Sequence, residues 1–190
     1  STAVRLFLAI NLQPEVRRAV IEATSDLRAA APTLNWIDES RVHPTLKFLG
    51  EQEHAVVAPL SEALDGVTGR HRQFPVRIGD VGAFPNFRRA RVVWIGVDRD
   101  PRLELLHHDV ELACKKLGFE VEGRAFRPHL TLARVRERAA EEELRRLSRA
   151  SKRVTFEREE EVRSVDVMRS NLARAGTRYD RLHSAPLRAH

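Results

Sequence analysis

Two short phrases of the same kind recur in this chain, and each combines a histidine with a threonine two residues later. The sequence reads His-Pro-Thr-Leu at positions 43–46 and His-Leu-Thr-Leu at positions 129–132. Each phrase lies in an apolar alternation typical of a β-strand, where residues i and i+2 point to the same face. Two such pairs brought together supply two titratable nitrogens and two hydroxyl donors around one small charged group. Acid–base chemistry on a phosphate ester requires this combination, so the repetition predicts an enzyme.

A simpler interpretation of the phrases stays open. Each histidine can be a strand residue whose ring binds a neighbouring carbonyl, with the threonine present for its β-propensity. The other six histidines of the chain have no threonine two residues later. We assign no role to those six.

The segments around the phrases predict how they are positioned. Apolar periodicity and turn residues predict strands over 4–10, 34–37, 41–49, 74–81, 91–97, 124–134, 154–160, 161–169 and 177–187, and helices over 15–30, 53–64, 101–117 and 139–150. A helix follows each motif strand, and the phrases lie about half a chain length apart. We predict an α+β fold in which residues 1–190 form one domain of two pseudo-symmetric lobes. Its two antiparallel sheets face a central cleft, with the helices outside.

Composition limits the class of protein. No apolar run approaches the roughly 18 residues that span a bilayer, and residues 3–12 lack a secretory cleavage site. The single cysteine, Cys114, excludes an intrachain disulfide, so we expect a buried thiol and a cytoplasmic protein. The formal net charge of +6, largely arginine, favours a polyanionic partner such as RNA. Solvated pairs, such as glutamates 141–143 before Arg145 and Arg146, are the alternative explanation of that charge.

At these residues the chain resembles the two-histidine (2H) phosphoesterase superfamily. It is most similar to the bacterial and archaeal RNA 2',3'-cyclic phosphodiesterases, once named 2'-5' RNA ligases. The resemblance covers nearly the whole chain. Residues 5–10 resemble the family's opening strand, Trp36 with residues 42–50 its first signature, residues 127–134 its second, and residues 91–97 the strand between them.

The resemblance implies hydrolysis of an RNA 2',3'-cyclic phosphate to a 2'-phosphate, without a metal or other cofactor. His43 is then the acid toward O3' and His129 the base toward water. In-line displacement needs an acid and a base on opposite sides of phosphorus, and imidazoles with near-neutral pKa values allow one ring to be charged while the other is neutral. Thr45 and Thr131 are expected to donate hydrogen bonds to the non-bridging oxygens, which gain charge in the transition state.

Further candidates lie close to the motifs. Arg134 falls where the family carries a substrate-binding arginine, and its charge would anchor the phosphate. Phe48 either stacks on the terminal base or belongs to the core. Arg127, Lys47 and the pair at 88–89 are weaker candidates for the phosphates of upstream nucleotides. The loop at 82–89, rich in arginine and aromatic residues, is expected to reach a substrate.

Several other functions remain as alternatives. The same site catalyses the reverse reaction, so minor 2'-5' RNA ligation is expected beside hydrolysis. A non-catalytic module that binds RNA ends, or a 2H phosphodiesterase for another cyclic nucleotide, fits the same motifs. A metal site on His43 and His129 lacks the closely spaced Asp, Glu or Cys ligands that such sites usually add. We assign Trp36 and Trp94 to the core and expect a monomer without a membrane partner.

Overall fold

The computed structural model describes residues 3–137 and 139–189. Its strands are β1 (Ala3–Ile10), β2 (Asn35–Trp36), β3 (Thr45–Glu53), β4 (Phe74–Phe84), β5 (Val92–Val97), β6 (His129–Arg134), β7 (Glu157–Val162), β8 (Ser164–Ala173) and β9 (Gly176–Pro186). The α-helices are α1 (Pro14–Ala23), α2 (Ser25–Ala30), α3 (Val57–Thr68), α4 (Pro101–Lys116) and α5 (Glu141–Ser151). Short 3₁₀ helices are η1 (Glu39–Arg41), η2 (His54–Val56) and η3 (Phe87–Arg89).

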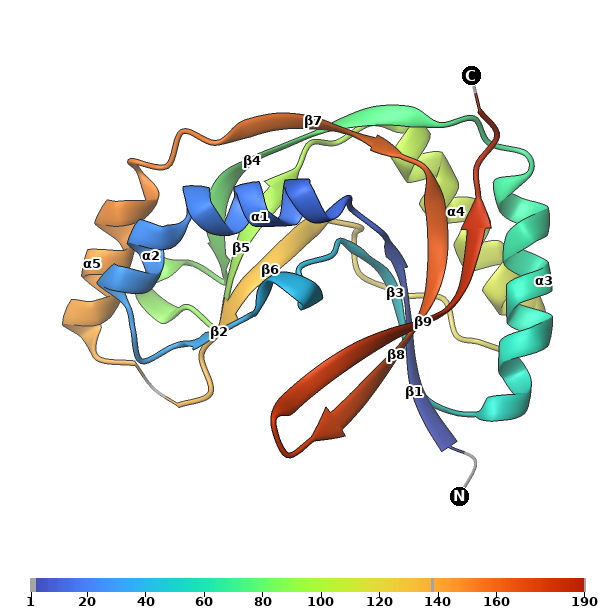
Figure 1. Cartoon of the computed structure of the whole chain (residues 1–190), viewed down its shortest axis with the longest axis horizontal. Coiled ribbons are helices and arrows are strands. Elements are labelled where there is room, and N and C mark those ends of the chain that lie inside the picture. Colours follow the sequence, from blue (N-terminus) through green and yellow to red (C-terminus); the bar gives the residue numbers. More distant parts are fainter. Residues whose placement is uncertain (1–2, 138, 190) are drawn as a thin grey trace.

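The strands form two antiparallel sheets (Figure 1). The first sheet has the order β3-β1-β8-β9, and the second has the order β2-β6-β5-β4-β7. The chain moves repeatedly from one sheet to the other, and Arg163 alone separates β7 of the second sheet from β8 of the first. The α+β class with two antiparallel sheets is therefore confirmed. No helix in the described part of the chain is long and apolar enough to cross a membrane.

One face of each sheet is buried in a common hydrophobic core. Leu6 and Leu8 on β1, and Val93 and Ile95 on β5, are at most 1% exposed. Helix α3 packs against β8 and β9, and α2 packs against α5. Phe7, between the two leucines of β1, belongs instead to a small separate cluster on the other face of the first sheet. Alternation along the strands thus leaves one face of each sheet available for a site.

The strand predicted over 41–49 is wrong at both ends. Its start is occupied by η1, and His43 precedes the strand, which begins at Thr45. Pro44 has no N–H to donate to a ladder, which explains the late start. The predicted strand stops before Gly50, but the φ of +69° at this glycine only bends the chain and β3 continues.

Other boundaries also shift. The helix predicted over 15–30 is two helices that meet at Thr24, whose hydroxyl donates to the Val20 carbonyl at 2.8 Å. The helix predicted over 53–64 starts as η2 and becomes α-helical only in α3. The strand predicted from 124 begins at His129, after an irregular loop. The expectation that a helix follows each motif strand is confirmed by α3 and α5.

Candidate active site

The two motif phrases meet where the sheets join. An isolated antiparallel bridge pairs Pro44, just before β3, with Leu130 in β6. The Ile10 N–H donates to the Pro44 carbonyl at 3.0 Å, which ties the same point to β1. Leu130 is fully buried in the core. The phrases, far apart in sequence, therefore lie side by side.

The bridge also determines which way the motif side chains point. In an antiparallel bridge the residues one step on either side of the bridged pair lie opposite each other. His43 is therefore opposite Thr131, and Thr45 is opposite His129. Opposed residues share a face, and this face is the one turned away from the buried Leu130. The four motif side chains consequently line one surface.

Both motif strands bulge at the leucine that follows the threonine. The β1–β3 pairing skips Leu46, and the β5–β6 pairing skips Leu132. Both leucines are buried, at 5% and 1% exposure. A bulge shifts the alternation by one residue, so Phe48 and Arg134 come to the face of the motif threonines. Strict alternation would have turned both of these side chains toward the opposite face.

The His129 ring is held by a carbonyl and flanked by aromatic rings. Its Nδ1 lies 2.7 Å from the Arg127 carbonyl, and because a carbonyl only accepts, Nδ1 carries the proton. Nε2 then has a lone pair, and it makes no hydrogen bond to any described residue. The Phe84 and Trp94 ring centroids lie 5.3 and 6.4 Å away. Burial lowers the pKa of His129, the hydrogen bond to the Arg127 carbonyl opposes this, and the positive charge of Arg134 adds to the lowering.

His43 is more deeply buried, at 8% exposure. Its Nε2 donates to the Ser40 carbonyl at 3.0 Å, and its Nδ1 is enclosed without a partner. Burial lowers the pKa of His43 to about 4, helped by the charge of Arg17 and opposed by the Ser40 carbonyl. Both motif rings are therefore neutral at pH 7 in this structure, whereas the sequence allowed one of them to be charged. The simpler interpretation holds in part, because each ring binds one carbonyl, but each also keeps one nitrogen without a partner.

Trp94, which we assigned to the core, lies beside the motifs. It pairs with Thr131 across β5 and β6, and its indole covers Gly82 in β4. A Cβ at Gly82 would lie 2.3 Å from the indole, so only glycine fits there. Phe84, which the sequence assigned to a loop, is the last residue of β4 and packs against Trp94 with ring centroids 5.1 Å apart. The glycine opposite a tryptophan is the sequence signal that could have revealed this wall.

A second aromatic group lies on the first sheet. Tyr179 in β9 packs edge-on against Phe7 at 4.7 Å, and its ring centroid is 6.5 Å from that of His43. Arg41 lies over the Tyr179 ring at 6.0 Å. Phe48 is 71% exposed and 6.3 Å from Phe7, which excludes its core interpretation. No motif around Tyr179 marks it in the sequence.

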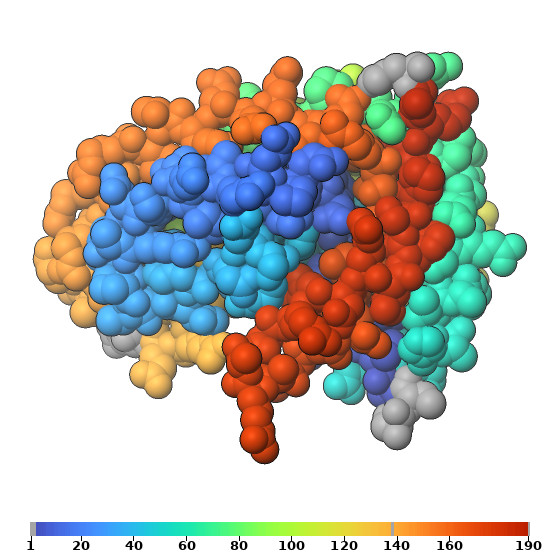
Figure 2. Space-filling model, viewed as in Figure 1, coloured from blue at the N-terminus to red at the C-terminus, as the bar shows by residue number. Residues whose placement is uncertain are grey.

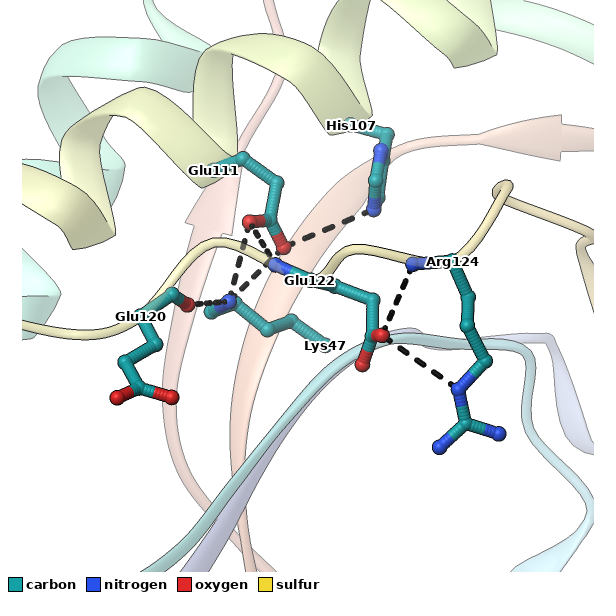
Figure 3. Close-up of polar contacts among 6 residues, drawn as sticks. All are labelled: Lys47, His107, Glu111, Glu120, Glu122 and Arg124. Atoms are coloured by element: carbon teal, nitrogen blue, oxygen red, sulfur yellow. Dashed lines mark hydrogen bonds and ion pairs between the residues drawn. The ribbon is translucent and has the colours of Figure 1, made fainter.

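Lys47, a weaker candidate for substrate phosphates, is not available for that role. Its Nζ is buried and binds both carboxylate oxygens of Glu111, at 2.9 and 3.1 Å, and the Glu120 carbonyl at 2.7 Å (Figure 3). The Glu122 N–H donates to the same Glu111 carboxylate at 3.1 Å. The bulge at Leu46 explains the error, because it turns Lys47 toward the core side of β3.

This cluster fixes the loop that leads into the second motif. Glu120 and Glu122 belong to the irregular segment 117–128 between α4 and β6. His107 of α4 stacks on Phe126 of the same segment, with ring centroids 3.9 Å apart. The segment that supplies the carbonyl bound to His129 is therefore anchored at three points.

The remaining candidates lie at the surface. Arg127 has an exposed side chain and contacts the site through its carbonyl alone. Arg88 and Arg89 are exposed on η3. Residues 3–137 and 139–189 contain no group of three or more His, Cys, Asp or Glu side chains that could hold a metal ion.

Comparison with known proteins gives one family. The profile of the 2'-5' RNA ligase superfamily matches residues 10–173. An RNA 2',3'-cyclic phosphodiesterase of Methanothermobacter thermautotrophicus is 31% identical over 183 residues, which cover 93% of this chain and 95% of the relative. A protein of the same name from Geobacillus stearothermophilus is 34% identical over 128 residues, 67% of this chain, but the match spans only 41% of that relative.

Solved structures agree over the full length. TT0787 of Thermus thermophilus superposes with a TM-score of 0.79 at 27% identity, covering 98% of this chain and 99% of the other. E. coli LigT in complex with 3'-AMP superposes with a TM-score of 0.72 at 28% identity, covering 97% of this chain and 98% of the other.

Proposed function

Because this chain belongs to the 2'-5' RNA ligase superfamily, we propose that it hydrolyses RNA 2',3'-cyclic phosphate ends to 2'-phosphomonoesters. The observation that carries the proposal is the Pro44–Leu130 bridge, which sets two His/Thr pairs on one face. Relatives named RNA 2',3'-cyclic phosphodiesterase support the choice of substrate.

The hydrogen bonds of the two rings support different roles for them. His129 donates from Nδ1 to a carbonyl, so its Nε2 lone pair is free to take a proton from water. His43 donates from Nε2, and this N–H faces only the Ser40 carbonyl. We assign His129 as the base because of its free lone pair, and His43, as the other ring at the site, as the acid toward O3'.

An acid must carry a transferable proton, and the low pKa of His43 works against this role in the free protein. Substrate binding would raise this pKa, because a cyclic phosphate diester carries one negative charge. A charge about 4 Å from the ring, at an effective dielectric constant of about 20, interacts by roughly 4 kcal/mol, or about three pKa units. Substrate binding would thus protonate His43 at neutral pH and prepare it to donate to the leaving oxygen.

The other candidates have positions suited to binding the end of an RNA chain. Thr45 and Thr131 would donate to the non-bridging oxygens, where charge grows in the transition state. Arg134, on the same face, would hold the phosphate through its guanidinium. The exposed ring of Phe48 would stack on the terminal base, a contact worth roughly 1–3 kcal/mol and tolerant of base identity.

Two further properties follow as part of the proposal. The same groups would catalyse the reverse reaction, giving minor 2'-5' ligation, although water favours hydrolysis. The two lobes would be a duplicated unit, because each contributes a histidine, a threonine and a bulged leucine in the same order. We propose that the protein acts as a monomer.

The test is to incubate the protein, with EDTA present, with an oligonucleotide that ends in a 2',3'-cyclic phosphate. We expect a 2'-phosphate product, identified by its resistance to a 3'-phosphate-specific phosphatase. A matched oligonucleotide that ends in a 3'-phosphate is the control and should stay unchanged. A 3'-phosphate product, or a reaction abolished by EDTA, would contradict the proposal.

A further inference from the structure

The outer end of the β8–β9 hairpin stands away from the rest of the molecule. Figure 1 shows it as a two-stranded ribbon that projects at the bottom of the view, and Figure 2 shows a notch between its tip and the segment that follows β6. Residues 172–176 are all exposed, and Leu172 is 90% exposed. The Leu172 side chain is therefore available to contact a ligand at the tip of the hairpin.

The hairpin starts at the candidate active site. Tyr179, next to His43, pairs with Ser170, and Thr177 pairs with Leu172 one step further out. Residues two apart on a strand share a face, and cross-strand partners share it too. These side chains therefore form one row that runs from the site to the tip.

The charge of the hairpin suits a polyanion. Residues 169–181 contain four arginines and one aspartate. Arg181 pairs with Met168, which packs beside Phe7, so it lies on the side of the site. The side chain of Arg174, at the turn, makes no ion pair or hydrogen bond within the described part of the chain. Arg181 also lies 3.9 Å from Asp166, so Arg174 is the hairpin arginine whose guanidinium is free to match phosphate oxygens in geometry and charge.

The opposite face of the hairpin is braced. Asp180 accepts from Arg169 at 3.0 Å and from Asn171, and it forms an ion pair with Arg178 at 3.3 Å. A projecting two-stranded ribbon is marginally stable by itself, so this network helps to hold its shape. A surface held in shape before binding loses less entropy when a ligand arrives.

We propose that the β8–β9 hairpin is an arm that binds the RNA chain on the 5' side of the cyclic phosphate. The proposal rests on the proposed function, since it places the reacting end beside His43. The three residues from Tyr179 to the turn at Gly176 span about 10 Å. At roughly 3.4 Å per nucleotide of a helical strand, the tip meets the third or fourth nucleotide from the end. Leu172 packs on its base or ribose, and Arg174 binds its phosphate.

The kinetic test compares a 2',3'-cyclic mononucleotide with an octanucleotide that ends in the same group. In the wild type, kcat/KM should be higher for the octanucleotide. Arg174→Ala and Leu172→Ser should each lower the ratio of the two kcat/KM values by about five- to tenfold. The control is Lys115→Ala, which removes one exposed positive charge from α4 and should leave the ratio unchanged.

A binding measurement separates this proposal from the hydrolytic one. The affinity for an octanucleotide that already carries a 2'-phosphate is measured by fluorescence anisotropy over a salt series. Arg174→Ala should reduce the affinity and make the salt slope about one phosphate contact shallower. Unchanged ratios and slopes in both hairpin variants would overturn the arm, whether or not the mononucleotide is hydrolysed. If the wild type self-associates and Leu172→Ser abolishes this while RNA binding stays intact, the proposal would also be overturned, and the hairpin tip would be assigned to a contact between two copies of the chain.

Discussion

Binding of a phosphate anion should raise the pKa of His43 by about three units. Burial and the charge of Arg17 hold the pKa of His43 at about 4, and Nδ1 has no partner to stabilise an added proton. One negative charge about 4 Å away contributes roughly 4 kcal/mol at an effective dielectric constant of about 20. Since 1.36 kcal/mol corresponds to one pKa unit, the pKa of His43 should then reach about 7.

The assay is an NMR titration of the histidine ring signals, with and without a saturating 2'-nucleotide. His43→Gln assigns the signal, and the signal of His54, exposed on η2, reports any nonspecific effect of the anion. The expected result is a His43 titration that moves from about pH 4 to near neutrality. A His43 midpoint that stays in place or falls when the nucleotide binds would refute the reasoning, because no phosphate charge would then lie near the ring.

Three further outcomes are expected. Phe48→Ala should mainly raise KM, whereas Arg134→Ala should both raise KM and lower kcat, because the Arg134 charge stabilises the bound substrate and the transition state. Steady-state kinetics of both variants check this, and an Arg134→Ala variant that changes KM alone, as Phe48→Ala does, would remove Arg134 from the chemistry. Lys47→Met should destabilise the protein by about 3–5 kcal/mol in urea unfolding, because the buried Glu111 charge then lacks its lysine, while a second change of Glu111→Leu should recover most of the loss. A double variant no more stable than Lys47→Met would contradict the pairing. The free energy of unfolding should fall by up to about 3 kcal/mol as the pH drops from about 6.5 to 4, because in this range the unfolded chain binds a proton at His43 and the folded chain does not. His43→Gln should flatten this part of the stability curve, and an equally steep curve in that variant would disprove the low pKa of His43.

Much of the fold could be predicted because it depends on local patterns. The strand alternation around Leu6 and Ile95 and the helix between Pro101 and Gly118 follow from residue periodicity and from end signals. The repeated His-x-Thr phrase indicated the site for the same reason. Its two copies needed only a sheet to bring them together.

The rest depended on contacts that local patterns do not encode. Bulges at Leu46 and Leu132 reverse the alternation, so the facing of Phe48, Lys47 and Arg134 could not be read from a period of two. The buried partner of Lys47 lies on a helix far along the chain. The pseudo-twofold relation between the lobes stays a prediction.

Aromatic residues showed the same limit. Trp94 was assigned to the core because burial favours large apolar side chains, yet it lies on the half-buried face of β5, opposite the core face that carries Val93 and Ile95. Tyr179 reaches His43 through the β8–β9 register, which a bulge between Val167 and Met168 shifts. The places of Trp94 and Tyr179 beside the motif histidines could not be predicted without knowing how the two sheets pack together.

The most direct test of the two-histidine site is the turnover of a 2',3'-cyclic mononucleotide, with EDTA present, by the wild type, His43→Ala and His129→Ala. Each substitution should lower kcat by roughly 10²–10⁴-fold, the loss expected for a general acid or base, with folding verified by circular dichroism. Near-wild-type kcat in either folded variant would contradict the account.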